Sequence, residues 1–436
     1  MKNSETILEK IRTNKEIVGV IGLGYVGLPL AVNFAEAGVQ VIGFEKSAEK
    51  ADKINHGDNY IKDIRDAVLR DVVEKITLSA TTDFSRIREC DALLICVPTP
   101  LDVFRKPDMS YIESACIDIG RHMKPNVFIS LESTTYPTTT EDFMLPIIER
   151  ESGLKHGEDF WLAFSPERVD PGNKNFHTRN TPKVLGATTP DGLEIGKNLY
   201  SKAIDTIHTV SSPRVAEMVK ILENTYRLIN ISLINELALL AGKMGINIWE
   251  VIEAANTKPF GFQAFSPGPG IGGHCIPLDP FYLEYIAQKF SFDLSMIHTA
   301  GHINMRMPHY MYIKIATTLN RHKKSVNGSN ILFLGVAYKP DIDDERESPA
   351  LEIMDITAHK GASISYHDPF IPQVKTHEGR SYKSVALTEE TLRQADCVVI
   401  TTNHSVFDAD FIVKHAPLIV DLRNMIKESS EKVYKL

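Results

Sequence analysis

The chain has 436 residues, of which 43% are hydrophobic and 24% are charged, and its formal net charge is -8. At about 150 residues per domain this length predicts two or three globular units, and the composition excludes a fibrous or wholly disordered protein. The negative charge argues against a nucleic-acid partner, and no apolar run reaches the roughly 18 residues that span a bilayer. Residues 1–16 lack the apolar core of a signal peptide, so we expect a cytoplasmic protein with no membrane partner.

The first predicted elements are a strand, a glycine turn and a helix. An apolar run at 17–21 leads into the glycines Gly22, Gly24 and Gly27, and a helical pattern covers 28–37. In a dinucleotide-binding turn the first glycine permits the tight turn, the second lets a pyrophosphate approach the backbone, and the third lets the helix pack on the strand. This context makes dinucleotide binding the preferred interpretation over a purely structural turn.

A second strand at 39–44 closes this βαβ unit and ends on an acidic residue, Glu45. Its carboxylate can accept hydrogen bonds from the ribose hydroxyls and would repel a 2′-phosphate. The pattern therefore favours NAD over NADP as cofactor, although Lys46 lies next to it.

Three more strands complete a doubly wound α/β domain, which we predict at 1–205. They are expected at 92–97, 127–131 and 161–164. A single long helix follows from Pro213 to about Lys243, opened by Ser212 as its cap. We expect this helix to join two domains within a central region at 206–325, and to pair with a copy of itself in a homodimer or higher homo-oligomer.

A second α/β pattern occupies 326–436 and resembles the first. Its strand at 331–334, helix at 349–359 and strand at 362–366 follow the same order, and the run from Ala395 to Thr401 echoes that from Cys90 to Cys96. The expected fold class is therefore α/β, with two Rossmann-like doubly wound domains joined by a long central helix. Within this degenerate repeat, the first copy alone keeps all three glycines of the turn.

The five cysteines are odd in number and show neither a CxxC motif nor a Cys/His spacing typical of a metal site, so we expect no disulfide framework and no metal. Four of them lie in apolar runs, which is typical of buried small side chains: Cys90, Cys96, Cys116 and Cys397. Cys275 instead lies in a loop rich in glycine and proline, 266–279, and such loops carry function more often than packing. Its neighbour His274 is a weaker candidate, because adjacent side chains of an extended loop diverge.

Two further features have ordinary structural alternatives. Lys220 and Asn224 lie four residues apart, on one face of the long helix, which by itself indicates a solvated face. Asp279 precedes Pro280 and could simply cap a turn.

Together these segments resemble the UDP-glucose/GDP-mannose dehydrogenase family, from about residue 17 to 425. The matching motifs are Gly22 to Pro29 (GLGYVGLP), Ser165 to Arg168 (SPER), Lys220 to Asn224 (KILEN), Gly272 to Asp279 (GGHCIPLD), Tyr338-Lys339 and Arg346 to Pro349 (RESP). The resemblance implies that two NAD molecules oxidise the C6 alcohol of a UDP-sugar to a carboxylate, and that the second α/β domain binds the uridine diphosphate.

The resemblance also implies roles for individual residues. Cys275 is the covalent nucleophile, because an aldehyde yields its second hydride only after a nucleophile adds to the carbonyl. The other expected catalytic residues are Lys220 and Asn224 for the oxyanion, Asp279 and Glu167 for proton transfer, and Thr134 for placing a water. The expected cofactor contacts are Gly22, Gly24, Tyr25, Val26, Gly27, Glu45, Pro98, Thr99 and Thr134. The expected substrate contacts are Glu167, Arg168, Lys220, Asn224, Gly272, Lys339 and Arg346.

The choice of sugar rests on the same loop. His274 and Leu278 depart from the UDP-glucose branch of the family, and the sequence resembles the branch that acts on UDP-N-acetylglucosamine, in bacterial surface polysaccharide synthesis. UDP-N-acetylmannosamine, UDP-N-acetylgalactosamine and UDP-glucose stay open as alternatives. A single-step β-hydroxyacid dehydrogenase and an inactive sugar-nucleotide sensor are more distant ones.

Overall fold

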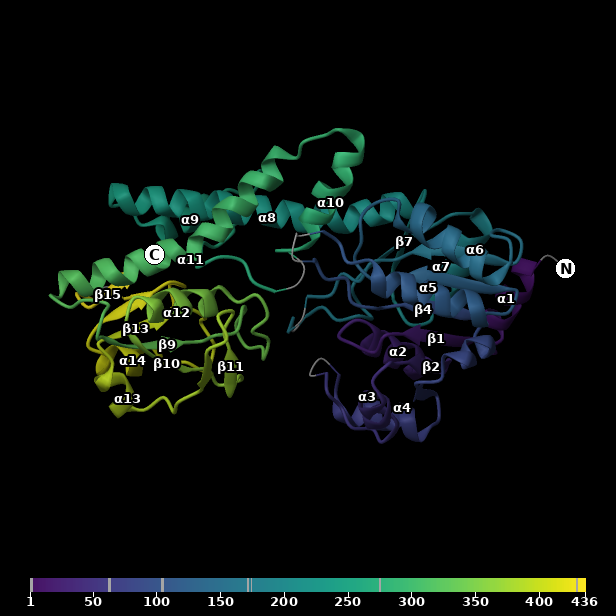
Figure 1. The fold of residues 1–436 in the computed structure, drawn as a ribbon, viewed down its shortest axis with the longest axis horizontal. Coiled ribbons are helices and arrows are strands. Elements are labelled where there is room, and N and C mark those ends of the chain that lie inside the picture. The colour runs from purple at the N-terminus through teal and green to yellow at the C-terminus, as the bar shows by residue number, and fades with distance from the viewer. Residues whose placement is uncertain are drawn as a thin grey trace. The chain divides into compact units, whose positions relative to one another are not determined.

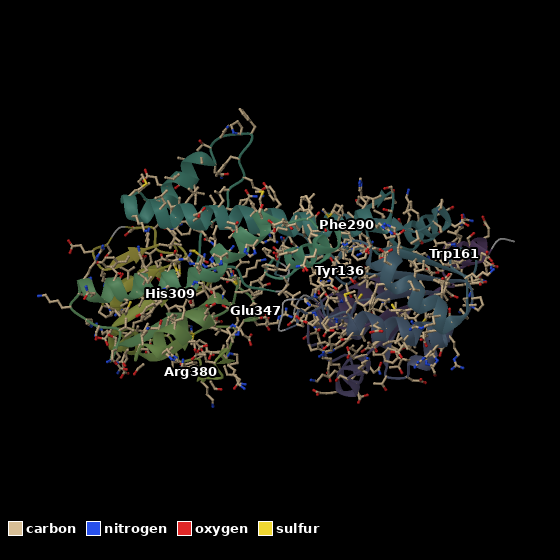
Figure 2. All side chains as sticks on the ribbon, turned by 45° about the horizontal axis from the view of Figure 1, so that its top comes forward. Tyr136, Trp161, Phe290, His309, Glu347 and Arg380 are labelled. Atoms are coloured by element: carbon tan, nitrogen blue, oxygen red, sulfur yellow. The ribbon has the colours of Figure 1, made fainter. Side chains whose placement is uncertain are left out.

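A computed structural model describes residues 3–436, apart from 62–63, 103–105, 171, 174, 274–275 and 429. The chain forms two compact units (Figure 1). Unit 1 contains the residues up to Glu223 together with Phe281–Ser291, and unit 2 contains Asn224–Pro280 and Phe292–Leu436. Figure 2 shows their side chains and labels Trp161 in unit 1 and Glu347 in unit 2.

Unit 1 is built on an eight-stranded sheet in the order β3-β2-β1-β4-β5-β6-β7-β8. The strands are β1 (Ile17–Ile21), β2 (Gln40–Phe44), β3 (Leu78–Thr81), β4 (Ala92–Ile95), β5 (Val127–Leu131), β6 (Phe160–Phe164), β7 (Lys183–Ala187) and β8 (Ile207–Val210). All neighbouring strands run parallel except β6 and β7. The order 3-2-1-4-5-6 is that of a dinucleotide-binding Rossmann fold, to which β7 and β8 add two strands that the sequence did not predict.

Helices cover both faces of this sheet. The helical elements are α1 (Asn3–Arg12), α2 (Gly27–Glu36), α3 (Ala48–Asn55), α4 (Asp66–Glu74), η1 (Phe84–Glu89), α5 (Ser110–His122), η2 (Thr139–Met144), α6 (Leu145–Ser152), α7 (Pro190–Tyr200) and η3 (Gln288–Phe290). One buried cluster joins α1, α2, α3, α4 and α7 to one face, and a second joins α5 and α6 to the other. These two apolar layers make the sheet the rigid support of the turns at its carboxyl edge.

The long helix α8 runs from Pro213 to Met244, which at 1.5 Å per residue is about 48 Å. The Ser212 hydroxyl accepts the Val215 N–H at 3.3 Å, as expected for a cap, and Gly245 ends the helix with a φ of 71°. The long central helix predicted from the sequence is therefore confirmed. Among the described residues no helix is long and apolar enough to cross a membrane.

Unit 2 contains a parallel sheet in the order β10-β9-β13-β14-β15 and a two-stranded ribbon. The strands are β9 (Asn330–Leu334), β10 (Ser363–His367), β11 (Gln373–Lys375), β12 (Ser381–Lys383), β13 (Cys397–Ile400), β14 (Ile419–Asp421) and β15 (Val433–Lys435). The helices are the remainder of α8, α9 (Ile248–Ala255), α11 (Ser295–Arg321), α12 (Pro349–His359), α13 (Glu389–Gln394) and α14 (Ala409–His415), and α10 (Asp279–Ala287) spans the boundary with unit 1. Helices α11 and α12 pack on one face of the sheet, while α13 and α14 pack on the other.

The two sheets repeat one pattern, because β2-β1-β4-β5 corresponds to β10-β9-β13-β14. The repeat extends to single hydrogen bonds. Asp91 accepts the Ile17 N–H at 3.1 Å, and Asp396 accepts the Asn330 N–H at 2.8 Å. The predicted fold class, with two Rossmann-like domains, is confirmed.

Candidate functional site

The glycine turn after β1 has the geometry that its sequence predicted. Gly22 has a φ of 90°, and a Cβ there would lie 2.7 Å from the carbonyl oxygen of Cys96. A Cβ on Gly27 would lie 1.9 Å from the carbonyl oxygen of Gly22, so helix α2 approaches the turn as closely as it does because Gly27 has no side chain. A Cβ on Gly24 would meet nothing within 4 Å. The turn is therefore tightly packed at Gly22 and Gly27 and open at Gly24, as pyrophosphate binding requires.

Glu45 lies at the end of β2, beside this turn. Its carboxylate accepts the N–H groups of Leu23 at 3.3 Å and Ser47 at 3.1 Å, and the Tyr60 hydroxyl donates to the Leu23 carbonyl at 2.6 Å. Glu45 is only partly buried. An acceptor in this place fits the adenosine ribose of NAD, and the turn fits its pyrophosphate.

The other predicted cofactor contacts follow the carboxyl ends of neighbouring parallel strands, where Rossmann folds bind their ligands. Tyr25 and Val26 follow β1, Pro98 and Thr99 follow β4, and Thr134 follows β5. Tyr25 and Pro98 are exposed, and the other three are partly buried. Unit 1 therefore brings these residues to one edge of its sheet.

Lys220 projects from α8 within unit 1 and is buried, at 9% exposure. Its Nζ donates to the main-chain carbonyl of Glu167 at 2.7 Å. The Glu167 carboxylate is occupied differently, since its Oε1 accepts the N–H groups of Arg168 and Val169, each at 2.8 Å. The structure thus brings Lys220 and the loop of Glu167 together through the main chain.

Arg168 was expected to contact the substrate. In the structure its guanidinium is paired with the Glu223 carboxylate on α8, with Nη2–Oε1 at 2.5 Å and Nε–Oε2 at 3.3 Å, and its Nη1 donates to the Pro182 carbonyl at 2.7 Å. These bonds tie the 165–168 loop to the helix that carries Lys220. Arg168 therefore has a positioning contact that the sequence did not suggest.

A buried charged pair supports the same loop. The Lys183 ammonium lies 2.5 Å from the Glu132 carboxylate, both side chains are at most 5% exposed, and the Tyr200 hydroxyl also donates to Glu132. Lys183 reaches the Pro166 carbonyl at 3.5 Å. Sequence reasoning missed this pair, and its available signal was an acid directly after the apolar strand β5.

Asn224 and Asp279 meet within unit 2. The amide nitrogen of Asn224 donates to the Asp279 carboxylate at 2.5 Å, and both residues are buried, at 5% and 3% exposure. Asp279 is the first residue of α10. Lys220 and Asn224 therefore do not form a solvated helix face, because both side chains are buried and hydrogen-bonded.

Gly272 and Gly273 rest on the loop that follows β9. A Cβ on Gly272 would lie 2.6 Å from the Cβ of Tyr338 and 2.7 Å from the carbonyl oxygen of Glu347, and the Gly273 N–H donates to the Arg346 carbonyl at 3.1 Å. The segment before Cys275 therefore packs directly on residues 338–347, and the absence of a side chain at Gly272 permits this approach. Glu347 is labelled in Figure 2.

The same loop carries Lys339 and Arg346. Lys339 is partly buried, whereas Arg346 is exposed and forms a two-pronged pair with Asp344, at 2.8 and 2.6 Å. Both cations lie in the segment between β9 and α12, at the carboxyl edge of the second sheet. Diphosphates bind at this edge in Rossmann folds.

Arg423 is a third cation at this edge, and the sequence analysis did not include it. It follows β14, its Nε donates to the Thr401 carbonyl at 2.9 Å, and a Cβ on Gly268 would lie 2.4 Å from its Nη1. Burial lowers the pKa of its guanidinium to about 10. An arginine two residues after the end of a buried strand was the signal that could have indicated it.

The four cysteines that lie in apolar runs are buried, as predicted. They are Cys90, Cys96, Cys116 and Cys397. Burial raises the pKa of each thiol, to about 12 for Cys90 and Cys397. None of these four is suited to act as a thiolate nucleophile. Cys275 and His274 lie outside the described residues.

The open glycine turn and Glu45 define a dinucleotide-binding protein that has a second Rossmann-type domain. Family models match in chain order: the NAD binding domain of the UDP-glucose/GDP-mannose dehydrogenase family at 16–204, its central domain at 214–306 and its UDP binding domain at 332–428. The chain belongs to this family and is an NAD-dependent UDP-sugar dehydrogenase.

Relatives in the family are named for different sugars, including the two that follow. The chain is 35% identical to a UDP-N-acetyl-D-mannosamine dehydrogenase of Pyrococcus horikoshii, over 94% of this chain and 96% of that one. It is also 35% identical to a UDP-N-acetyl-D-glucosamine 6-dehydrogenase of Pseudomonas aeruginosa, over 81% and 83%. The solved structure of the Pyrococcus horikoshii enzyme superposes with a TM-score of 0.87, at 34% identity over 96% and 98% of the chains.

Proposed function

We propose that the chain oxidises C6 of UDP-N-acetylglucosamine to give UDP-N-acetylglucosaminuronate, with Cys275 as covalent nucleophile. The observation that carries this proposal is the state of the other thiols, which are all buried with a raised pKa and so leave Cys275 as the candidate. The family motif from Gly272 to Asp279 supports the same choice.

The reaction balances as two hydride transfers and one hydrolysis. When bound at the glycine turn, NAD would supply the hydride acceptor for each oxidation. The first converts the alcohol to an aldehyde, to which the Cys275 sulfur adds to form a thiohemiacetal. The second leaves a thioester, and water cleaves the C–S bond to release the carboxylate and restore the thiol. One alcohol and one water thus yield one carboxylate, two NADH and three protons.

The described residues suit the proton and charge transfers of this scheme. The Lys220 ammonium and the Asn224 amide are hydrogen-bond donors for the oxyanion of each addition step. Asp279, which accepts from Asn224, and Glu167 are the acid/base candidates, with Thr134 placing a water. Their assignment to individual steps is part of the proposal.

The proposed substrate and cofactor contacts are divided between the two Rossmann-type domains. In unit 1 the NAD contacts are proposed at the glycine turn, Glu45 and the residues that follow β4 and β5. In unit 2 Lys339, Arg346 and Arg423 supply positive charge for the diphosphate, and Gly272 allows a close backbone approach. Glu167 and Arg168 complete the proposed substrate contacts, Arg168 through the loop that it anchors.

The identity of the sugar is the most specific element of the proposed activity. N-acetylglucosamine is favoured by the residues around Cys275, and relatives are named for both N-acetylglucosamine and N-acetylmannosamine. These sugars differ in the configuration at one carbon. UDP-N-acetylmannosamine, UDP-N-acetylgalactosamine and UDP-glucose are therefore the competing substrates of the test.

The test is an assay of NADH release with a panel of UDP-hexoses and UDP-N-acetylhexosamines. We expect the highest kcat/KM with UDP-N-acetylglucosamine and two NADH per sugar consumed. Higher kcat/KM with an epimer would reassign the sugar and leave the chemistry intact. One NADH per sugar would contradict the covalent route and favour a single-step dehydrogenase.

Cys275→Ala tests the nucleophile, with Cys397→Ala as a matched control in unit 2. Because Cys397 is buried, its replacement affects packing alone, and we expect the two-NADH stoichiometry to survive. Cys275→Ala should abolish carboxylate formation, with a loss of at least about 10³-fold in kcat. Full activity of this variant would refute the proposal.

We also propose that α8 pairs with a second copy of this chain. Within unit 2 an apolar stripe of exposed residues recurs at intervals of three, four or seven positions, which is the spacing of a helix-pairing face. It consists of Tyr226, Leu233, Leu237, Leu240 and Met244. A stripe along one helix is self-complementary to its own copy across a two-fold axis, which favours a homodimer.

Light scattering tests this pairing. The double variant Leu237→Glu/Leu240→Glu should convert a dimer into a monomer at micromolar concentration, because it places charges in the apolar stripe. Ile313→Glu is the matched control, since Ile313 is equally exposed on α11. A wild-type monomer, or a dimer unaffected by the double variant, would contradict the proposal.

A further inference from the structure

The carboxyl edge of the second sheet contains a buried imidazole outside the proposed catalytic set. His404 follows β13, is 2% exposed, and packs against the rings of Phe370 and Phe407, with centroid distances of 5.1 and 5.2 Å. An imidazole so enclosed needs partners for both of its nitrogens. The contacts at these nitrogens are therefore informative.

Both nitrogens of His404 are bonded in defined directions. Its Nδ1 lies 3.0 Å from the main-chain nitrogen of Asp341, and its Nε2 lies 3.0 Å from Oδ2 of Asp368. A backbone N–H can only donate, so Nδ1 is the acceptor and the proton is on Nε2. His404 is thus a neutral imidazole that donates to Asp368 and accepts from Asp341.

Asp368 is well suited to fix this tautomer. Its carboxylate accepts the N–H groups of Val336 at 2.7 Å, Ala337 at 3.1 Å and Phe370 at 2.9 Å. Burial alone would raise its pKa, but the hydrogen bonds from His404 and from the Val336 and Phe370 amides bring that pKa below its ordinary value. Asp368 is therefore a charged acceptor that orients the ring.

Asp341 is the point at which the ring holds the neighbouring loop. Its φ is 63°, a left-handed conformation that is uncommon outside glycine, although aspartate adopts it more readily than most residues. Its carboxylate accepts the N–H and the hydroxyl of Ser405, at 2.8 and 3.0 Å. Residues 404 and 405 therefore clamp Asp341 through both its backbone and its side chain.

The clamped loop bears the proposed binding residues. Lys339 and Arg346 flank Asp341 on it, the Tyr338 N–H closes it by donating to the Asp344 carbonyl at 3.0 Å, and Gly273 donates to the Arg346 carbonyl. A displacement at Asp341 would consequently reach the diphosphate contacts and the segment before Cys275. All of these contacts lie within unit 2.

We propose that His404 is a positioning residue of this dehydrogenase, which holds the 338–346 loop in its binding conformation by accepting the Asp341 N–H. The inference rests on the proposed roles of Lys339 and Arg346. The Asp368–His404–Asp341 arrangement acts through the loop and does not touch the reacting atoms.

Three replacements of His404 separate its two hydrogen bonds. His404→Phe keeps a ring against Phe370 and Phe407 and removes both bonds. His404→Asn places an oxygen at the position of Nδ1, so it can restore the acceptor for Asp341. His404→Gln reaches instead to the position of Nε2 and can restore only the donor to Asp368. His415→Phe is the matched control, because His415 is a second buried histidine of unit 2, on α14.

The measurements are amide hydrogen exchange, calorimetric titration with UDP and with NAD, and KM and kcat for the UDP-sugar. For His404→Phe we expect at least tenfold faster exchange in 336–347, at least tenfold weaker UDP binding, a raised KM and unchanged NAD affinity. His404→Asn should recover most of this loss, whereas His404→Gln should resemble His404→Phe. His415→Phe should match the wild type in these readouts.

Wild-type exchange in 336–347 and wild-type UDP affinity in His404→Phe would overturn the proposal. Equal acceleration of exchange throughout unit 2 would also overturn it, because the role would then be general stability. Recovery by Gln instead of Asn would overturn the assignment of Asp341 as the essential partner. Exchange and UDP binding do not require turnover, so failure of the proposed sugar chemistry would be seen separately in the NADH assay.

Discussion

The two Rossmann-type domains share a strand arrangement but differ in whether the turn after the first strand is open to a ligand. After β1 the turn is open, since Gly24 has free space above it and Glu45 is partly exposed. After β9 the turn is closed. Gly335 corresponds to Gly22, so Ala337, two residues further on, corresponds to Gly24, and Ala337 is buried. A repeat can therefore keep its strands and lose its dinucleotide site by changing a few turn residues.

The acid after the second strand shows the same contrast. Glu45 accepts two main-chain N–H groups and keeps exposed surface for a ribose. Asp368, at the corresponding position after β10, is 3% exposed, accepts main-chain amides through both oxygens and is covered by His404. Glu45 is therefore available to a ligand, whereas Asp368 is used for hydrogen bonds within the protein.

The largest expected effect concerns the turn of unit 1. Gly27→Ala would place a Cβ 1.9 Å from the carbonyl oxygen of Gly22, and we expect it to cost about 3 kcal/mol or more and to abolish NAD binding. Gly24→Ala is the control: it meets no protein atom within 4 Å, so it should keep the wild-type stability and weaken NAD binding alone. Urea denaturation and NAD titration check both, and a Gly27→Ala protein as stable as the wild type would contradict the comparison.

The two units should also differ in pH dependence. Burial raises the pKa of Glu217 on α8 to about 7, although it accepts the N–H groups of Thr138 and Thr140, at 2.6 and 2.9 Å. The folded state then binds more protons than the unfolded state between the ordinary pKa of 4.5 and about 7, so unit 1 loses stability as pH rises through this window. The loss is on the order of 3 kcal/mol.

Glu217→Gln should remove this slope, whereas Glu49→Gln, at an exposed position, should keep it. For Asp368 the pKa is lowered, so its contribution in unit 2 is present above the ordinary value of 3.8 and is lost as pH falls further. Denaturation at several pH values, followed separately for each unit by hydrogen exchange, measures both slopes. Identical slopes in the wild type and Glu217→Gln would refute the assignment.

A smaller effect is expected when Asp368 or Glu45 is replaced by the corresponding amide. Asp368→Asn turns an NH₂ group toward main-chain donors in a buried site and should cost about 3 kcal/mol. Glu45→Gln should cost less than about 1 kcal/mol and act mainly on the cofactor, with roughly tenfold weaker NAD binding. Equal costs in urea denaturation would show that both acids are structural.

The smallest difference should come from the aspartates that precede β4 and β13. Asp91 is 3% exposed and bonded to Lys10 and Lys124, at 2.7 and 2.9 Å, whereas Asp396 is 29% exposed and bonded to Lys324. We expect Asp91→Asn to cost about 2 kcal/mol and Asp396→Asn less than about 1 kcal/mol, because solvent screens the more exposed pair. Thermal denaturation of the two variants decides the order, and the reverse order would contradict it.

The sequence predicted the frame of the fold well, because β1, β5, α8 and α12 are long or strongly patterned elements with clear caps and glycine stops. It did not predict β7 and β8, or the continuation of α11 through Pro308, since short strands and a tolerated internal proline leave weak local signals.

By itself the sequence determined the glycine turn, the acid that follows it, the repeat of the two domains and the identity of the family, because these depend on local spacing and motif. The tertiary structure decided which charges meet. Arg168 is paired with Glu223, Lys183 with Glu132, and His404 with Asp341 and Asp368. These partners are far apart in the chain and come together only when the chain folds, so no local pattern could show them.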